Sequence, residues 1–241
     1  MSTKKEQSIL GILSCFNKMA DIVLAQLNLI EKLMKDTDKT KLQELINSIK
    51  KNEIEIDKYE VSISDKFINA IVLYQPVASD IRKLVAVYRM TINLERIGDS
   101  VMNIAYTIET LRDSDEYKAM SELILNMLLS GKIMVEKSLL SFVNSDADYA
   151  IWTIKNDSVI DEMNRKLLIN SISKARISNK IKEMLLSYAE LRNIITNIER
   201  IGDHATNIAE AAIYSLKGTD IRHSGFDKDD QNCMEETGHK L

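Results

Sequence analysis

Residues 93–105 read NLERIGDSVMNIA, and residues 197–209 read NIERIGDHATNIA. The two segments lie 104 residues apart, and nine of their thirteen positions are identical. Four polar residues recur within them: Glu95, Arg96, Asp99 and Asn103 return as Glu199, Arg200, Asp203 and Asn207. A duplication that only enlarged a hydrophobic core would need to repeat the apolar pattern alone. The repeated charged residues therefore indicate a function that both halves share.

The composition and the apolar spacing predict an all-α protein. The 241 residues include one proline and seven glycines, and aromatic residues make up 5% of the chain. Apolar residues recur every three or four positions, as expected for helices with one buried stripe. The spacing is itself duplicated, since Phe16, Met19 and Val23 correspond to Met120, Leu123 and Met127. We expect six long helices that form two tandem three-helix bundles related by the internal repeat.

Breaks in the pattern predict where the helices end. The first should end near Lys35 and the second at Tyr74, because Gln75-Pro76 follows and the residue before a proline disfavours helical geometry. Proline suits the first turn of a helix, so the third is predicted to begin about Pro76 and the fourth near Asp115. The predicted organisation is a first bundle over 1–112, a second over 113–216, and a disordered polar tail over 217–241.

Charge and cysteine content exclude several classes of function. The net charge is −4, and no basic run is interleaved with aromatic residues, so nucleic acid is not an expected partner. Two isolated cysteines do not suggest a disulfide framework, which fits a reducing cytoplasm. The N-terminus lacks the apolar core of a signal peptide, and no uncharged apolar stretch of 18 residues is present. We therefore expect a cytoplasmic protein without direct membrane insertion.

Acidic pairs at a spacing of four residues are the candidate functional groups. Residues four apart share one helical face. Each half is predicted to carry one such pair on its second helix and one on its third: Glu53/Asp57 and Glu95/Asp99, then Asp157/Asp161 and Glu199/Asp203. A fifth pair, Glu109/Asp113, is not related by the repeat. If the two helices of each half are adjacent, four carboxylates converge, and a bound cation such as iron, zinc, manganese, magnesium or calcium would relieve their repulsion.

A solvated acidic face is the alternative interpretation of these pairs. The helical wheel places Glu95 and Asp99 opposite the apolar stripe of their helix, which predicts an outward-facing, surface site. Both copies of the motif have glycine at the same position, Gly98 and Gly202. Glycine inside a helix lowers stability by about 1 kcal/mol relative to alanine, so its recurrence needs a reason. Either close helix packing or a ligand between the carboxylates would explain them. His204 has no counterpart in the first half, where Ser100 stands, and is interpreted as incidental rather than as a metal ligand.

The chain resembles the PhoU proteins, regulators of bacterial phosphate uptake, over about residues 8–216. The resemblance rests on the two ERIGD motifs, on the segment QPVASDIRKLVAVYRM at 75–90, and on the paired acidic repeats. It implies two three-helix bundles, a homodimer and no catalytic chemistry. It also implies multinuclear iron or zinc clusters on the bundle surface, held by the eight acidic residues named above. Asp80 and Arg82 match charged positions of the family segment, but Met184 and Leu186 stand at the equivalent places in the second half.

The resemblance further implies partners and a regulatory role. Proteins of this family repress the phosphate-starvation response through contact with the transporter ATPase subunit and with a sensor histidine kinase. Two other functions remain as alternatives: an accessory protein of a different phosphate permease, and a structural bundle without metal. A di-iron enzyme is disfavoured, because that class needs Glu-x-x-His pairs that project into a bundle core. Glu236/His239 alone has this spacing, and it lies in the predicted tail.

Overall fold

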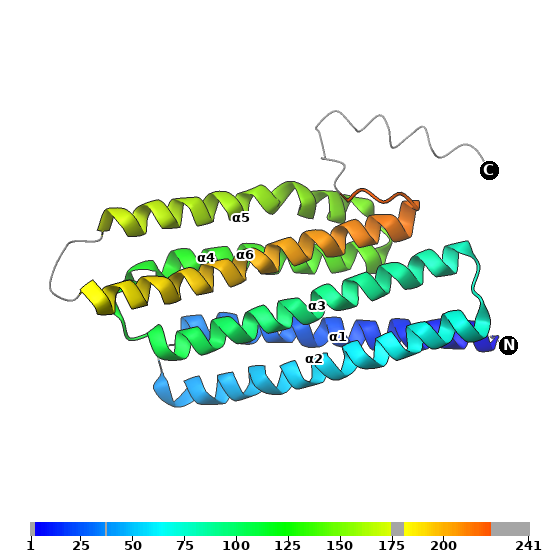
Figure 1. The fold of residues 1–241 in the computed structure, drawn as a ribbon, viewed down its shortest axis with the longest axis horizontal. Helices are drawn as coiled ribbons and strands as arrows, with labels where there is room; N and C mark the ends of the chain where they lie inside the picture. The colour runs from blue at the N-terminus through cyan, green and yellow to red at the C-terminus, as the bar shows by residue number, and fades with distance from the viewer. Residues whose placement is uncertain (1–2, 37, 175–180, 223–241) are drawn as a thin grey trace.

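The computed structural model describes residues 3–36, 38–174 and 181–222, and it is all-α within them, with no β-strand. Six long helices follow one another: α1 (Lys4–Lys35), α2 (Lys39–Tyr74), α3 (Ala78–Leu111), α4 (Asp115–Asn144), α5 (Ala147–Lys174) and α6 (Ile181–Lys217). Helices α1 to α3 form one antiparallel bundle and α4 to α6 form the second (Figure 1). The predicted fold class, two tandem three-helix bundles, is confirmed.

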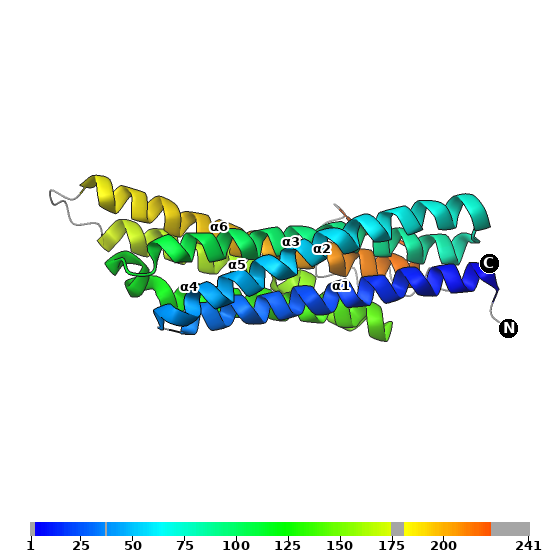
Figure 2. The ribbon, with the colours of Figure 1, turned by 90° about the horizontal axis from the view of Figure 1, so that it is seen from below.

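The two bundles lie side by side over most of their length and are offset along their long axis (Figures 1 and 2). Helix α3 packs against α6, and each of these carries one copy of the repeated motif. Helix α1 contacts α4 as well, where Phe16 meets Phe142 edge to face at 5.6 Å between ring centroids. At the same junction Lys132 Nζ lies 2.8 Å from Glu31 Oε2. The repeated motifs are therefore neighbours at the centre of the molecule.

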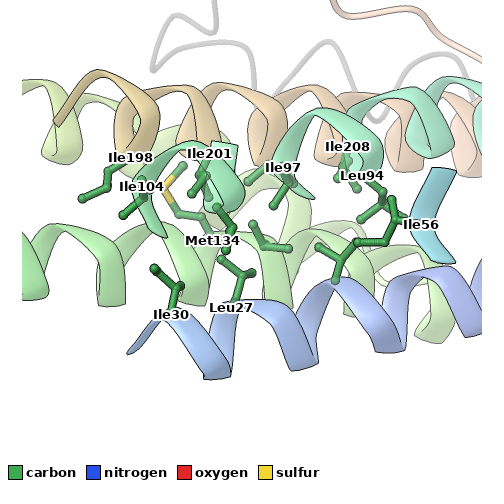
Figure 3. Packing of buried hydrophobic residues seen from close by; sticks show 14 of the residues in the cluster. Leu27, Ile30, Ile56, Leu94, Ile97, Ile104, Met134, Ile198, Ile201 and Ile208 are labelled. Carbon is green, nitrogen blue, oxygen red and sulfur yellow. The ribbon is translucent and has the colours of Figure 1, made fainter. Parts of the chain in front are cut away.

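One continuous hydrophobic core joins both bundles. Figure 3 shows side chains of α1, α3, α4 and α6 meeting there, including Leu27, Ile97, Met134 and Ile201. Leu27, Ile97 and Ile201 are fully buried, and Met134 is nearly so. Burying an aliphatic side chain of this size stabilises the fold by about 1.5–3 kcal/mol. Because the two halves share this core, they should unfold together.

The connection between α2 and α3 differs from the sequence-based prediction. Helix α3 begins at Ala78, two residues after the predicted start at Pro76. Gln75 takes a left-handed conformation, with φ 42°, that ends α2, and Val77 is still extended, with φ −73° and ψ 168°. Pro76 thus separates the two helices rather than beginning the second. The predicted ends at Lys35 and Tyr74 and the predicted start at Asp115 agree with the structure.

Helix α1 is long and apolar enough to cross a membrane by length and composition, and it is the one such helix among the described residues. Its apolar stripe is used inside the bundle, because Phe16, Met19 and Val23 are fully buried. A core helix satisfies the same criteria as a membrane span. Packing in the bundle thus uses part of the apolar surface of α1, since 28% of its most apolar 18-residue window is buried.

The start of the predicted tail packs on the bundles. Lys217 ends α6, and the segment that follows it contacts α3: Arg89 Nη1 lies 3.3 Å from Asp220 Oδ2. Ile221 packs beside the buried Ala209 and Ile213 of α6. Residues up to 222 therefore belong to the folded part, while the remainder of the predicted tail, 223–241, lies outside the described residues.

Candidate metal centre

The first acidic cluster, defined as Glu53, Asp57, Glu95 and Asp99, lies where α2 packs against α3. Asp57 and Asp99 are exposed, while Glu53 and Glu95 are partly buried. The predicted convergence of the two pairs is thus present, although Glu95 does not face fully outward as the helical wheel of α3 indicated. The charges of Asp99 and Asp57 each act on both Glu53 and Glu95.

Gly98 creates the space in which Glu53 sits. A Cβ atom on Gly98 would lie 2.8 Å from Glu53 Oε2, 3.1 Å from Ile56 Cδ1 and 3.2 Å from Gln26 Oε1. Side chains of α1 and α2 therefore occupy the place that any larger residue would need. Close approach of neighbouring helices explains this glycine, and the approaching groups include one of the candidate ligands.

Gln26 connects the buried face of α1 to the cluster. The side chain is fully buried, and its Nε2 donates to Glu53 Oε2 at 2.8 Å and to the Ile49 carbonyl at 3.4 Å. Glu53 Oε1 and Gln26 Oε1 are both buried without a hydrogen-bond partner. Gln26 was missed at the sequence level, but a polar residue between Val23 and Leu27 on an apolar stripe was a signal that could have revealed it.

The electrostatics of the first acidic cluster favour a neutralising partner. Burial raises the pKa of Glu53 to about 7; the Gln26 hydrogen bond opposes this, and the charges of Asp99 and Asp57 add to it. Burial and the charge of Asp99 likewise raise the pKa of Glu95 to about 6. Ionisation of both carboxyls is therefore unfavourable in free energy, and a bound proton or cation would offset this.

The second acidic cluster, defined as Asp157, Asp161, Glu199 and Asp203, lies between α5 and α6. Asp157 Oδ1 is 3.9 Å from the position of a Cβ on Gly202, next to Asp203. Glu199 is partly buried and Asp203 is exposed. Asp161 lies in α5, but its side chain is outside the described residues. The structure thus places Asp157 beside the second motif as the repeat predicts.

The two clusters differ in detail around the repeated glycines, Gly98 and Gly202. Ile160 Cδ1 lies 2.9 Å from the Cβ position of Gly202, as Ile56 Cδ1 lies 3.1 Å from that of Gly98. The aliphatic contact is therefore duplicated. The carboxylate contact is not, because Asp157 is shorter by one methylene than Glu53 and stays farther from the glycine.

The chemistry of the donor set fits a hard or borderline cation. Carboxylate oxygens are suitable ligands for such ions, and the buried Glu53 Oε1 lacks a partner. Among the side chains that the structure describes, no three acidic, histidine or cysteine groups are already arranged around a common point for a metal ion. Ligation of one ion by a whole cluster would thus require side-chain rotation at the exposed positions.

His204 and the recurring asparagines hold the two motifs together. His204 Nδ1 lies 3.0 Å from Asn93 Oδ1, and Asn207 Nδ2 donates to the same oxygen at 3.2 Å. Burial, followed by the charges of Arg96 and Arg200, lowers the pKa of His204 to about 4. The imidazole is therefore neutral at pH 7, with Nδ1–H as the donor. His204 links α6 to α3.

Asp80 and Arg82 lie far along α3 from the first acidic cluster and contact other ends of the chain. Lys5 Nζ is 2.8 Å from Asp80 Oδ2, which joins the first turns of α1 and α3. Arg82 packs beside Gly218, whose Cβ position would be 3.4 Å from Arg82 Nε. Gly218 follows α6 and has φ +74°.

Comparison with known families identifies the repeat. The sequence model described as the PhoU domain matches twice, over residues 16–108 and 118–212. The phosphate-specific transport system accessory protein PhoU homologue of Pseudomonas aeruginosa is 28% identical over 211 residues, covering 85% of this chain and 84% of that protein. The homologue with the same description from Aquifex aeolicus is 33% identical over 190 residues, covering 75% of this chain and 80% of that protein.

Solved structures show the same architecture. The crystal structure of PhoU from Pseudomonas aeruginosa superposes with a TM-score of 0.77 at 26% identity, covering 88% of this chain and 99% of that one. The phosphate transport system regulatory protein PhoU from Streptococcus pneumoniae gives a TM-score of 0.69 at 21% identity, over 90% of this chain and 99% of that one. The second likeness concerns the fold alone.

Proposed function

Because the chain belongs to the PhoU family, we propose that it is a non-enzymatic regulator of phosphate uptake that represses phosphate-starvation signalling. The observation that carries this proposal is the double match to the PhoU domain, which spans most of the chain. The match covers most of the length of two relatives, and both are described as phosphate-specific transport system accessory proteins. The proposed partners are the ATPase subunit of a phosphate transporter and a sensor histidine kinase, contacted in the cytoplasm.

A gene deletion tests the regulatory role. In a deletion strain, a phosphate-starvation reporter should be expressed constitutively in phosphate-rich medium, and the gene supplied in trans should restore repression. Unchanged reporter expression in the deletion strain would remove the proposal and favour an accessory role for a different permease.

We propose that both acidic clusters bind divalent or trivalent metal ions, namely iron or zinc in multinuclear sites. The support is the paired carboxylates in register with the repeat and the buried, unpartnered oxygen of Glu53. A bound cation would supply positive charge that offsets the repulsion within each cluster. The chain's own contribution is to hold Glu53 and Glu95 partly buried while Asp57, Asp99 and Asp203 remain accessible.

Metal content measured by mass spectrometry tests these sites. Protein purified without chelator or metal-affinity resin should contain metal, and the double variant Asp99→Ala/Asp203→Ala should contain much less. The matched control is Glu109→Ala/Asp113→Ala, which removes the acidic pair that the repeat does not duplicate. Equal metal content in the first variant and the wild type would leave a metal-free structural bundle as the better description.

We also propose that the protein acts as a homodimer. The outer face of α2 carries apolar side chains seven residues apart, Ile54, Val61 and Ile68, which are 48%, 60% and 58% exposed. A row of exposed apolar residues on one helical face is typical of a protein–protein contact. Lys58 and Asp65 flank Val61 and could pair reciprocally across a twofold axis at that residue. Light scattering after size exclusion measures the oligomeric state.

A further inference from the structure

We infer that Arg96 and Arg200 form a binding site for one small tetrahedral oxyanion of the phosphate class, at the seam where α3 packs against α6. Both arginines recur within the duplicated motif, and the acidic clusters leave them without a role. The inference rests on the proposed regulatory function for the choice of phosphate as the ligand. It adds to that function a site for the ion whose uptake is regulated.

Polar contacts fix the register of the two helices at the seam. Helices α3 and α6 pack side by side and run antiparallel (Figure 1). Asn207 Nδ2 of α6 donates to Asn93 Oδ1 of α3 at 3.2 Å, and Asn193 Nδ2 donates to Thr107 Oγ1 at 3.1 Å. The second contact lies 14 residues from the first on each helix. The two helices therefore stay in step over this stretch, and each position between the contacts faces a defined partner position.

This register brings the two arginines to opposite sides of the seam. Arg96 lies three residues from the first contact, on the face of α3 that packs against α6, and faces His204. Arg200 lies seven residues from the same contact along α6 and faces Ser100. The arginines are thus displaced along the seam by four residues, or about 6 Å, on helices whose axes lie about 8–10 Å apart. Both side chains can reach one ion between them.

The two guanidinium groups are accessible and have no partner within the part of the chain that the structure describes. Arg96 and Arg200 are both exposed, and neither side chain makes a hydrogen bond or an ion pair there. Ser100 does not compete for them, because its hydroxyl donates to the Arg96 carbonyl at 2.9 Å. The charges of both arginines act on His204, which agrees with their place at the seam.

The chemistry of the two side chains suits an oxyanion. A guanidinium group presents its N–H donors in a fixed planar fork, which pairs with two oxygens of a phosphate or carboxylate. Two forks on opposite sides match a tetrahedral ion, whose oxygens point in both directions, better than a planar carboxylate. The first acidic cluster flanks α3 on the side of α2 and opposes long-range attraction of an anion. The affinity should therefore depend on direct contacts with the two arginines.

Equilibrium dialysis with radiolabelled inorganic phosphate tests this inference, on the full chain at constant ionic strength and with a chelator present. The wild type should bind phosphate at one saturable site per chain. Arg96→Gln and Arg200→Gln should each weaken binding by about ten-fold or more, because each variant loses charge-assisted hydrogen bonds. Arg96→Lys and Arg200→Lys should weaken it less, since lysine keeps the charge but lacks the paired donors.

Arg192→Gln is the matched control, because it removes an exposed positive charge of α6 that lies about 12 Å along the helix from Arg200. This distance exceeds the screening length of about 8 Å at physiological ionic strength, so phosphate affinity should change by less than about two-fold. Sulfate should displace the labelled phosphate, since it presents the same tetrahedral oxygens, whereas an equal concentration of added chloride should not. Thermal unfolding checks that each variant is folded.

The outcomes separate this inference from the proposed function. The absence of saturable phosphate binding would overturn the site, and so would wild-type affinity in folded Arg96→Gln or equal displacement by chloride and sulfate. Deregulated reporter expression in the deletion strain, without phosphate binding by the protein, would leave the regulatory function standing and remove only this site. Binding that requires both arginines, with unchanged reporter expression in the deletion strain, would keep the site and remove the regulatory function.

Discussion

Replacing Glu53 by glutamine should stabilise the metal-free protein at pH 8. Burial holds the pKa of this carboxyl at about 7 in the folded protein, against an ordinary value of 4.5. Below pH 4.5 the group is protonated in both the folded and the unfolded state, and it imposes no cost. Between pH 4.5 and pH 7 the unfolded state releases its proton while the folded state retains it, so the folded state loses stability over this interval, and the loss is complete above pH 7.

The size of the effect follows from the two pKa values. Their difference corresponds to about 3 kcal/mol, and water around this partly exposed side chain reduces the expected gain to about 1–2 kcal/mol. Glutamine retains an oxygen that can accept the Gln26 hydrogen bond, so that contact is preserved in the variant.

Urea unfolding in the presence of a chelator, from pH 4.5 to pH 8.5, measures the difference. The stability of Glu53→Gln relative to the wild type should grow from about pH 4.5 to about pH 7, level off above pH 7, and be small near pH 4.5. Glu55→Gln, at an exposed position on the same helix, controls for the loss of one negative charge. A difference that does not vary with pH, or a less stable variant at pH 8, would refute the reasoning.

Three further predictions concern other parts of the molecule. Protonation of His204, whose pKa burial lowers to about 4, should destabilise the protein by about 1–2 kcal/mol between pH 7 and pH 4, and His204→Ser should reduce this loss in acid unfolding curves. Gly98→Ala should lower the free energy of unfolding by about 1–3 kcal/mol, because the new Cβ would meet Glu53. Gly11→Ala, where no atom lies within 4 Å, should raise it by up to about 1 kcal/mol. Urea unfolding of both variants measures the two changes. Val61→Lys should convert the dimer to a monomer in light scattering, and an unchanged mass would place the dimer contact elsewhere.

The fold was largely predictable because its determinants are local and repeated. Apolar spacing marks each helix, and the duplicated NxERIGD motif relates the two halves without any structural information. The predicted start of α3 was two residues too early. The prediction used the preference of proline for a first helical turn, but Val77, which follows Pro76, is still extended.

The convergence of the candidate acidic residues was predictable from the repeat, but their environment was not. A wheel of α3 alone turns Glu95 away from its own apolar stripe, but it cannot show that packing against α2 partly buries this carboxyl. Glu53 lies three residues before Ile56 and four after Ile49, so it shares the buried face of α2. The contact of Gln26 with Glu53 joins residues 27 positions apart on different helices, which no periodicity within one helix can indicate.

The contact of Arg89 with Asp220 has a consequence for how a partner would meet this protein. The short 112–114 connection joins α3 to α4 at one end of α3 (Figure 1), and beyond α6 the side chain of Asp220 pairs with Arg89 in the N-terminal half of α3. Because the 112–114 connection ties α4 to α3 and the Arg89–Asp220 pair ties the end of α6 to α3, sliding of the second bundle along α3 is opposed, although such shear is a common route to conformational change. The distance between the two acidic clusters is then set by the protein itself. A partner protein that contacts both clusters must match this distance and cannot change it on binding.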